Sequence, residues 1–72
     1  MERKKLDRIP EVKRLTGLSR SSIYGLMAAN EFPKSVVLGS RAVAWVHGEV
    51  MDWIEAAIAR RDAITPSNTG EH

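Results

Sequence analysis

Three serines and an arginine form the chemically distinctive cluster of this sequence, the run Ser19-Arg20-Ser21-Ser22. A serine becomes a nucleophile only beside a base, usually a histidine that a carboxylate orients. The chain has two histidines, His47 and His72, and neither is placed with a carboxylate to activate these serines. Cysteine is absent, and two isolated imidazoles do not make a plausible metal site. We therefore expect no enzyme activity, no metal and no cofactor.

The same residue types suit a nucleic acid ligand when they lie at the start of a helix. Ser19 is a favoured N-cap, and Leu18 before it can pack on Ile23. The free N–H groups of a helix start favour phosphate, and an arginine there can donate two hydrogen bonds to a guanine. Arg20 is the first candidate for such a base contact. The competing interpretation is that it pairs only with phosphate or with Glu31.

The predicted helix has an apolar face and a face of small side chains. At about 100° per residue, Ile23 and Leu26 lie together while Ser21 and Gly25 lie opposite. An ordinary solvated face would instead be rich in Glu, Lys and Gln. Gly25 costs about 1 kcal/mol relative to alanine in a helix interior, which favours close approach of a partner such as DNA. The alternative is that the glycine is merely tolerated.

A short helix and a tight turn precede this helix, and together they predict a helix-turn-helix. Pro10 suits the first helical position, and Val12 and Leu15 form its buried edge. Gly17 can take the left-handed conformation that ends a helix, and the second helix is expected to stop near Asn30 for the same reason.

Two β-prone runs follow and predict a hairpin. They span residues 35–38 and 41–45, with Gly39-Ser40 between them as a two-residue primed turn. In that register Val36 opposes Val43, and Leu38, Val43 and Trp45 share the core-facing side. Arg41 lies at the tip. Two strands alone are not stable in water, so the hairpin must pack on the helices.

A third helix is predicted from about residue 47 to residue 61. Its apolar positions recur at helical spacing and are Val50, Trp53, Ile54, Ala57 and Ile58. We interpret Trp53 and Trp45 as core residues rather than as platforms for base stacking. His47, near the start of this helix, is most simply a surface or capping residue.

Length and charge indicate one small domain with an uneven charge distribution. The chain has 72 residues and a net charge of +2. Residues 1–45 hold nine Lys or Arg and four acidic residues, whereas residues 46–72 hold two and five. A basic N-terminal part and an acidic C-terminal part are typical of a protein that binds a polyanion, although in a short chain such an imbalance also arises by chance.

The chain divides into three expected parts. Residues 1–8 are a flexible basic arm, residues 9–62 the folded domain, and residues 63–72 a polar, disordered tail. The arm either adds phosphate contacts or only aids solubility. No apolar run approaches the roughly 20 residues that span a bilayer, so we expect a cytoplasmic protein without a membrane partner.

Three motifs, TGLSRSSIY, FPK and LGSRAVAW, resemble the AlpA family of phage-type regulators, and the resemblance covers about residues 6–61. That family is similar in fold to excisionases and to MerR-type DNA-binding domains, which are small winged-helix modules without catalytic activity. The resemblance implies an α+β winged helix-turn-helix that binds double-stranded DNA at a promoter or at attachment-site repeats. Its function would be that of a transcriptional regulator of an integrated element, of an excisionase (a recombination directionality factor), or of both.

The resemblance also implies roles for individual residues. The candidate DNA-binding residues are Arg20, Ser21, Ser22 and Tyr24 on the second helix, Arg41 and Ser40 at the wing tip, and Lys34 of the FPK motif. Many relatives carry a long polar or basic side chain at the positions of Gly25 and Val46, so fewer basic contacts are expected here. An integrase and further copies of the chain, binding DNA cooperatively, are candidate partners.

The alternative function is that of a protein-interaction module without direct DNA readout. Such a winged helix would dock through the acidic face of the third helix, which carries Glu49, Asp52 and Glu55.

Overall fold

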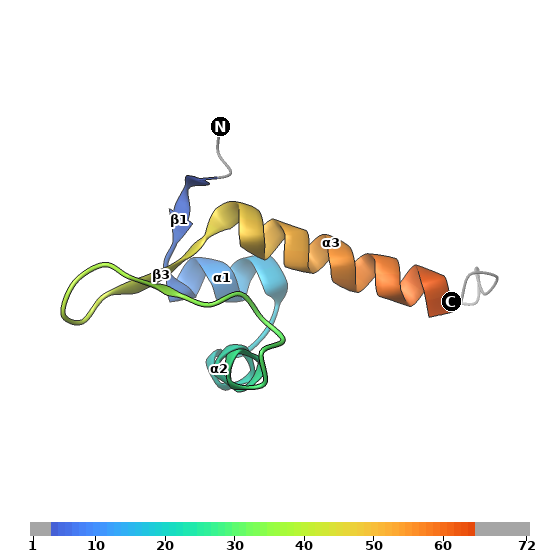
Figure 1. Cartoon of the computed structure of the whole chain (residues 1–72), viewed down its shortest axis with the longest axis horizontal. Coiled ribbons are helices and arrows are strands. Elements are labelled where there is room, and N and C mark those ends of the chain that lie inside the picture. The colour runs from blue at the N-terminus through green and yellow to red at the C-terminus, as the bar shows by residue number, and fades with distance from the viewer. Residues whose placement is uncertain (1–3, 65–72) are drawn as a thin grey trace.

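The computed structural model describes residues 4–64, which form a winged helix-turn-helix of the α+β class (Figure 1). The elements follow in the order β1 (Leu6–Asp7), α1 (Ile9–Thr16), α2 (Arg20–Ala28), β2 (Val36–Val37), β3 (Val43–Val46) and α3 (His47–Ile64). The predicted fold class is confirmed. No helix in the described range combines the length and hydropathy needed to cross a membrane.

The ends of the first two helices follow the local signals of the sequence. Gly17 is left-handed at φ 76°, and its N–H donates to the Lys13 carbonyl at 2.8 Å. Ser19 is extended and accepts a hydrogen bond from the Ser22 N–H at 3.1 Å. Asn30 has a φ of 62° directly after α2 and its turn. These three predictions are confirmed, because each residue has the backbone or side-chain property that its position requires.

The strands form a three-stranded antiparallel sheet in the order β1-β3-β2. In β1, Leu6 pairs with Val46 and Asp7 with Trp45. The predicted flexible arm is therefore wrong for Leu6 and Asp7, because their backbone groups pair with the central strand. Residues 1–3 of that arm lie outside the described residues.

The hairpin differs from its predicted register by one residue. Val36 pairs with Ala44, not with Val43, and the Leu38 N–H donates to the Ala42 carbonyl at 2.7 Å across a loop of residues 39–41. A primed turn needs a positive φ, and in residues 4–64 only Gly17 and Asn30 have one.

The expected core-facing position of Leu38 is also wrong, since this side chain is 47% exposed. Consecutive strand residues point to opposite faces. In β3 both Ala44 and Trp45 are fully buried, so both faces of the strand are covered. Hydrophobic alternation therefore does not select the register here.

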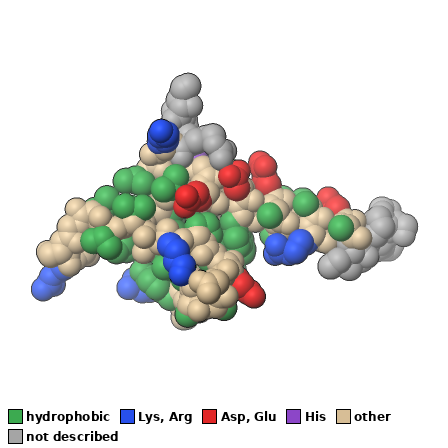
Figure 2. Space-filling view, in the orientation of Figure 1, with side chains coloured by type: hydrophobic (Ala, Val, Ile, Leu, Met, Phe, Trp, Pro, Cys, Tyr) green, Lys and Arg blue, Asp and Glu red, His purple; other side chains and the backbone are tan. Residues whose placement is uncertain are grey.

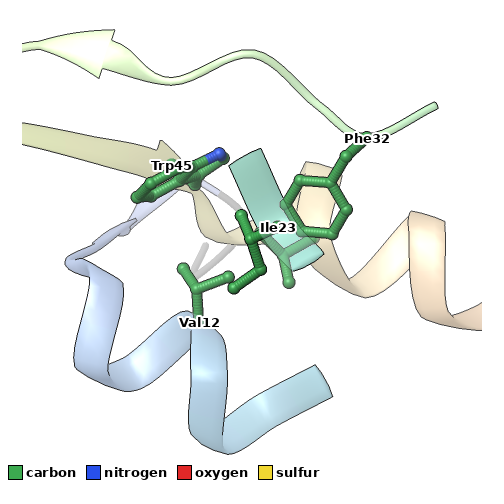
Figure 3. Close-up of a cluster of buried hydrophobic side chains, with 5 residues drawn as sticks. Val12, Ile23, Phe32 and Trp45 are labelled. Carbon is green, nitrogen blue, oxygen red and sulfur yellow. The ribbon is translucent and has the colours of Figure 1, made fainter. Parts of the chain in front are cut away.

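The core brings together one side chain from each of the three helices, one from β3 and one from the segment after α2. It consists of Val12, Ile23, Phe32, Trp45 and Val50, and the first four point toward one another in Figure 3. Trp45 is fully buried and donates its indole N–H to the Pro33 carbonyl at 3.1 Å. The prediction that the tryptophans are core residues is confirmed for Trp45, whereas Trp53 is half-buried and packs against the edge of this cluster.

The third helix is longer than predicted. It starts directly after β3 at His47 and continues to Ile64, and in Figure 1 its C-terminal part extends away from the other elements. The predicted tail began at residue 63, so its first two residues belong to α3. The rest of that tail lies outside the described residues.

A polar cluster joins β1 to the start of α3. Asp7 is 2% exposed, and its Oδ2 lies 2.7 Å from His47 Nδ1, while Lys5 Nζ lies 3.2 Å from Oδ1. The His47 N–H also donates to the Lys5 carbonyl at 2.6 Å. The prediction that His47 is a surface or capping residue is wrong, because its ring partners a carboxylate that is removed from water. A buried charge without such a partner is costly.

We expect His47→Ala to lower the free energy of unfolding by about 1–3 kcal/mol, because it leaves the buried Asp7 carboxylate without its closest partner. His47→Gln keeps a side-chain donor and should recover part of the loss. Chemical denaturation of both variants measures the effect. Equal stability of His47→Ala and the unmodified protein would contradict the role of this contact.

Candidate nucleic-acid interface

The start of α2 is an exposed helix N-terminus with a serine cap. Arg20, Ser21 and Ser22 are all exposed. The Ser19 hydroxyl accepts from the Ser22 N–H and donates to the Ser22 hydroxyl oxygen at 3.0 Å. The first N–H groups of a helix have no intrahelical acceptor, so those of Arg20 and Ser21 are available to a ligand. Such groups, together with the positive end of the helix dipole, favour an anion.

Arg20 is held over an aromatic ring. Its guanidinium carbon lies 5.4 Å from the centroid of the Tyr24 ring. Tyr24 in turn meets the buried Trp45 edge-on, with ring centroids 6.0 Å apart and an angle of 71° between the planes. Among the described residues Arg20 forms no ion pair with Glu31. The guanidinium of the exposed Arg20 side chain therefore lies against a ring that the core supports.

The outer face of α2 is open at Gly25. Gly25 and its helical neighbours Ser21 and Ala28 are exposed. A Cβ added at Gly25 would meet no other atom within 4 Å. Nothing in the described part of the chain therefore requires a glycine at this position.

The other candidate residues lie outside α2. Lys34 is exposed and donates from Nζ to Asn30 Oδ1 at 3.0 Å, just beyond the end of the helix. Ser40 and Arg41 are exposed in the hairpin loop. Figure 2 shows one basic side chain at the outer end of the hairpin, and along α3 it shows Asp and Glu side chains together with a basic one. The candidate residues thus come from three segments, the first turns of α2, the segment after it and the wing tip.

Several basic residues of the N-terminal part are engaged within the protein. Arg14 Nε donates to Glu11 Oε1 at 3.1 Å, and this hydrogen bond lowers the pKa of the Glu11 carboxyl below its usual value. Arg8 Nε donates to the Val43 carbonyl at 3.0 Å and so ties the start of α1 to the central strand. Charge counting along the sequence treats these arginines like Arg20 and Arg41, because a count does not show which side chains have partners within the protein.

Residues 5–58 match the family model described as Prophage CP4-57 regulatory protein (AlpA). The chain belongs to the AlpA family. The resemblance inferred from the three motifs is confirmed, and the matched range includes every candidate DNA-binding residue. Whether these residues bind DNA stays a prediction.

Two relatives align with most of this AlpA-family domain. An uncharacterized protein of Enterobacteria phage P4, ORF88, is 54% identical over 54 residues, which are 75% of this chain and 61% of that protein. The DNA-binding transcriptional activator AlpA of Escherichia coli K12 is 32% identical over 53 residues, which are 65% of this chain and 76% of that protein. The chain thus spans about three fifths of the length of the phage P4 protein.

Proposed function

We propose that this AlpA-family chain binds double-stranded DNA sequence-specifically and regulates a phage or an integrated element. The observation that carries the proposal is the exposed start of α2, where a serine-capped helix end lies beside Arg20. The relative from Escherichia coli is by its description a DNA-binding transcriptional activator. The same kind of activity is proposed for this chain.

In this proposal the start of α2 enters the major groove. The N–H groups of Arg20 and Ser21 meet a phosphate, and Ser22 and Tyr24 contact the flanking backbone. The Arg20 guanidinium donates to guanine O6 and N7, a contact that selects the base. Arg41, with Ser40 beside it, reaches the minor groove or its backbone, and Lys34 contacts a phosphate. The wing adds affinity while α2 supplies selectivity.

Two biological roles use the same DNA-binding surface. As a transcriptional regulator the protein would occupy a promoter. As an excisionase it would bind repeated attachment-site sequences, cooperate with further copies and bend the DNA for an integrase. A DNA-bending assay and an excision assay in a strain that lacks the protein separate the two roles. Bending together with an excision defect supports the excisionase role. The absence of both effects supports promoter regulation.

Selection of bound sequences from a random duplex library, followed by mobility shifts at two salt concentrations, tests the proposal. We expect one motif to be enriched. Affinity should fall steeply with salt, with a log–log slope of about −0.9 for each phosphate contacted. Binding without sequence preference, or binding insensitive to salt, would contradict it.

Gly25→Ala is expected to change stability and DNA affinity in opposite directions. The added methyl meets no atom of the protein and favours helix, so the free energy of unfolding should rise by about 1 kcal/mol. If DNA approaches the backbone here, affinity should fall roughly tenfold, equivalent to about 1.4 kcal/mol. Thermal melting and mobility shifts measure the two effects. Unchanged or tighter DNA binding would show that the glycine is only tolerated.

Arg41→Ala is expected to weaken binding about equally on selected and scrambled duplexes, because a phosphate or groove-width contact carries little direct base information. The salt slope should become shallower by about one unit. Arg60→Ala on α3 removes the same charge away from the proposed contacts and is the matched control. A loss confined to the selected duplex would assign Arg41 to base readout instead.

A further inference from the structure

A groove of about 900 Å³ lies between the C-terminal end of α2, the segment that follows it and one face of α3 between Glu49 and Arg60. Its apolar lining includes Leu26, Phe32 and Trp53. The volume is in the range of pockets that hold several side chains of a ligand. The groove reaches α2 only from Leu26 onward, so it leaves the first turns of that helix and the hairpin tip uncovered.

Contacts within the protein hold the aromatic side chains that line the groove. Phe32 and Trp53 meet edge-on with centroids 5.0 Å apart and an angle of 63° between their planes. The Trp53 indole N–H donates to the Glu31 carbonyl at 2.7 Å, and this bond joins α3 to the segment after α2. Phe32 is buried while Trp53 stays half-exposed. The Trp53 ring therefore offers apolar surface that needs little rearrangement to receive a side chain.

The charges on the rim indicate what the groove receives. Glu31, Glu49 and Asp52 line it and are exposed, against one basic lining residue, Arg60. This excess of carboxylates repels a phosphate backbone and attracts a cationic ligand. The net charge of the groove rim is opposite in sign to the net charge of residues 1–45, which hold nine basic and four acidic residues.

We propose that this groove docks a basic segment of a partner protein, in which Lys or Arg residues flank one large apolar side chain. The apolar side chain packs against Trp53 and Phe32, and the flanking cations meet the carboxylates of Glu31 and Glu49. The partner binds while the start of α2 remains free. This proposal adds a second binding surface to the proposed DNA-binding function and does not depend on it.

A displayed library of random dodecapeptides, selected on the complete 72-residue chain, tests the proposal. We expect the enriched peptides to contain two or more Lys or Arg around a large apolar residue. A selected peptide, added to isotope-labelled protein, should shift the Trp53 indole N–H signal and the Phe32 signals. It should leave those of the first turn of α2 unchanged.

Two variants that replace carboxylates with amides of the same size test whether the rim charges contribute to peptide binding. The double variant Glu31→Gln with Glu49→Gln keeps side-chain size and the Glu31 carbonyl, and should weaken the selected peptide about fivefold. Glu55→Gln removes an exposed carboxylate of α3 that does not line the groove, and should have less than about a twofold effect. Mobility shifts on DNA should be the same for all three proteins.

Three results would overturn the proposal. The first is no enrichment above a selection without protein. The second is an enriched peptide that binds the double variant as tightly as the unmodified chain. The third is a Trp53 signal that shifts with protein concentration in the absence of peptide, because a second copy of the chain would then occupy the groove.

Discussion

Trp45→Ala is expected to lose its cooperative thermal unfolding transition. Trp45 is fully buried among side chains from α1, α2 and α3. Replacing a buried tryptophan with alanine costs about 3–5 kcal/mol, which is about as much as the core of so small a domain supplies. The Pro33 carbonyl also loses its indole donor, and the Tyr24 ring loses its support. Circular dichroism during heating measures the transition.

Trp53→Ala is the comparison for this prediction. Trp53 is half-buried at the edge of the same cluster, and its truncation removes a ring contact with Phe32 and a hydrogen bond to the Glu31 carbonyl. We expect a loss of about 1–3 kcal/mol and a transition that is shifted but still cooperative. If Trp45→Ala melts cooperatively near the unmodified temperature, or if Trp53→Ala is the more damaging change, the core is placed wrongly.

Arg20→Ala is expected to weaken binding to the selected duplex by about 10- to 100-fold and to reduce discrimination against a scrambled duplex. A bidentate contact between arginine and guanine is worth about 1–3 kcal/mol of selectivity. Arg20 is exposed over Tyr24, so its removal should leave folding largely intact. Competition mobility shifts with both duplexes measure the two affinities, and a thermal melt verifies the fold.

The control for Arg20 is a change that keeps the charge. Arg20→Lys retains attraction to phosphate but not the planar pair of donors. It should therefore restore binding to the scrambled duplex more fully than binding to the selected one. If Arg20→Ala weakens binding equally on both duplexes and Arg20→Lys restores it completely, Arg20 contacts phosphate alone.

Local signals of the sequence were sufficient to predict the helix-turn-helix. Gly17, Ser19 and Asn30 act through their own backbone conformation or through a neighbour within four residues. The register of the hairpin was not predictable in the same way, because Ala44 and Trp45 are both buried and both faces of β3 are covered. In that situation alternation along the strand does not identify the inner face.

Contacts between distant residues were not predictable from the sequence. Asp7 and His47 are 40 positions apart, and nothing near either residue marks it as a partner of the other. The pairing of β1 with β3 brings them together. For the same reason Arg8, which donates to the Val43 carbonyl, was counted with an arm that contacts DNA or solvent.

The residues of the candidate interface were predictable from the sequence, whereas their spatial arrangement was not. Exposure of Arg20, Ser21 and Arg41 follows from helical spacing and turn position, and the structure agrees. The support of Arg20 by Tyr24, four residues later, follows the spacing of neighbours on one helix face. The contact of Tyr24 with Trp45 depends on the packing of α2 on β3 and left no signal in the sequence.

The most direct test of the DNA-binding surface is a titration of the isotope-labelled protein with its selected duplex, followed through the backbone amide signals. We predict that the largest shifts fall on residues 19–25 and 39–42, while α3 beyond residue 50 changes little. Largest shifts on α3, with the first turns of α2 unaffected, would contradict the proposed orientation on DNA.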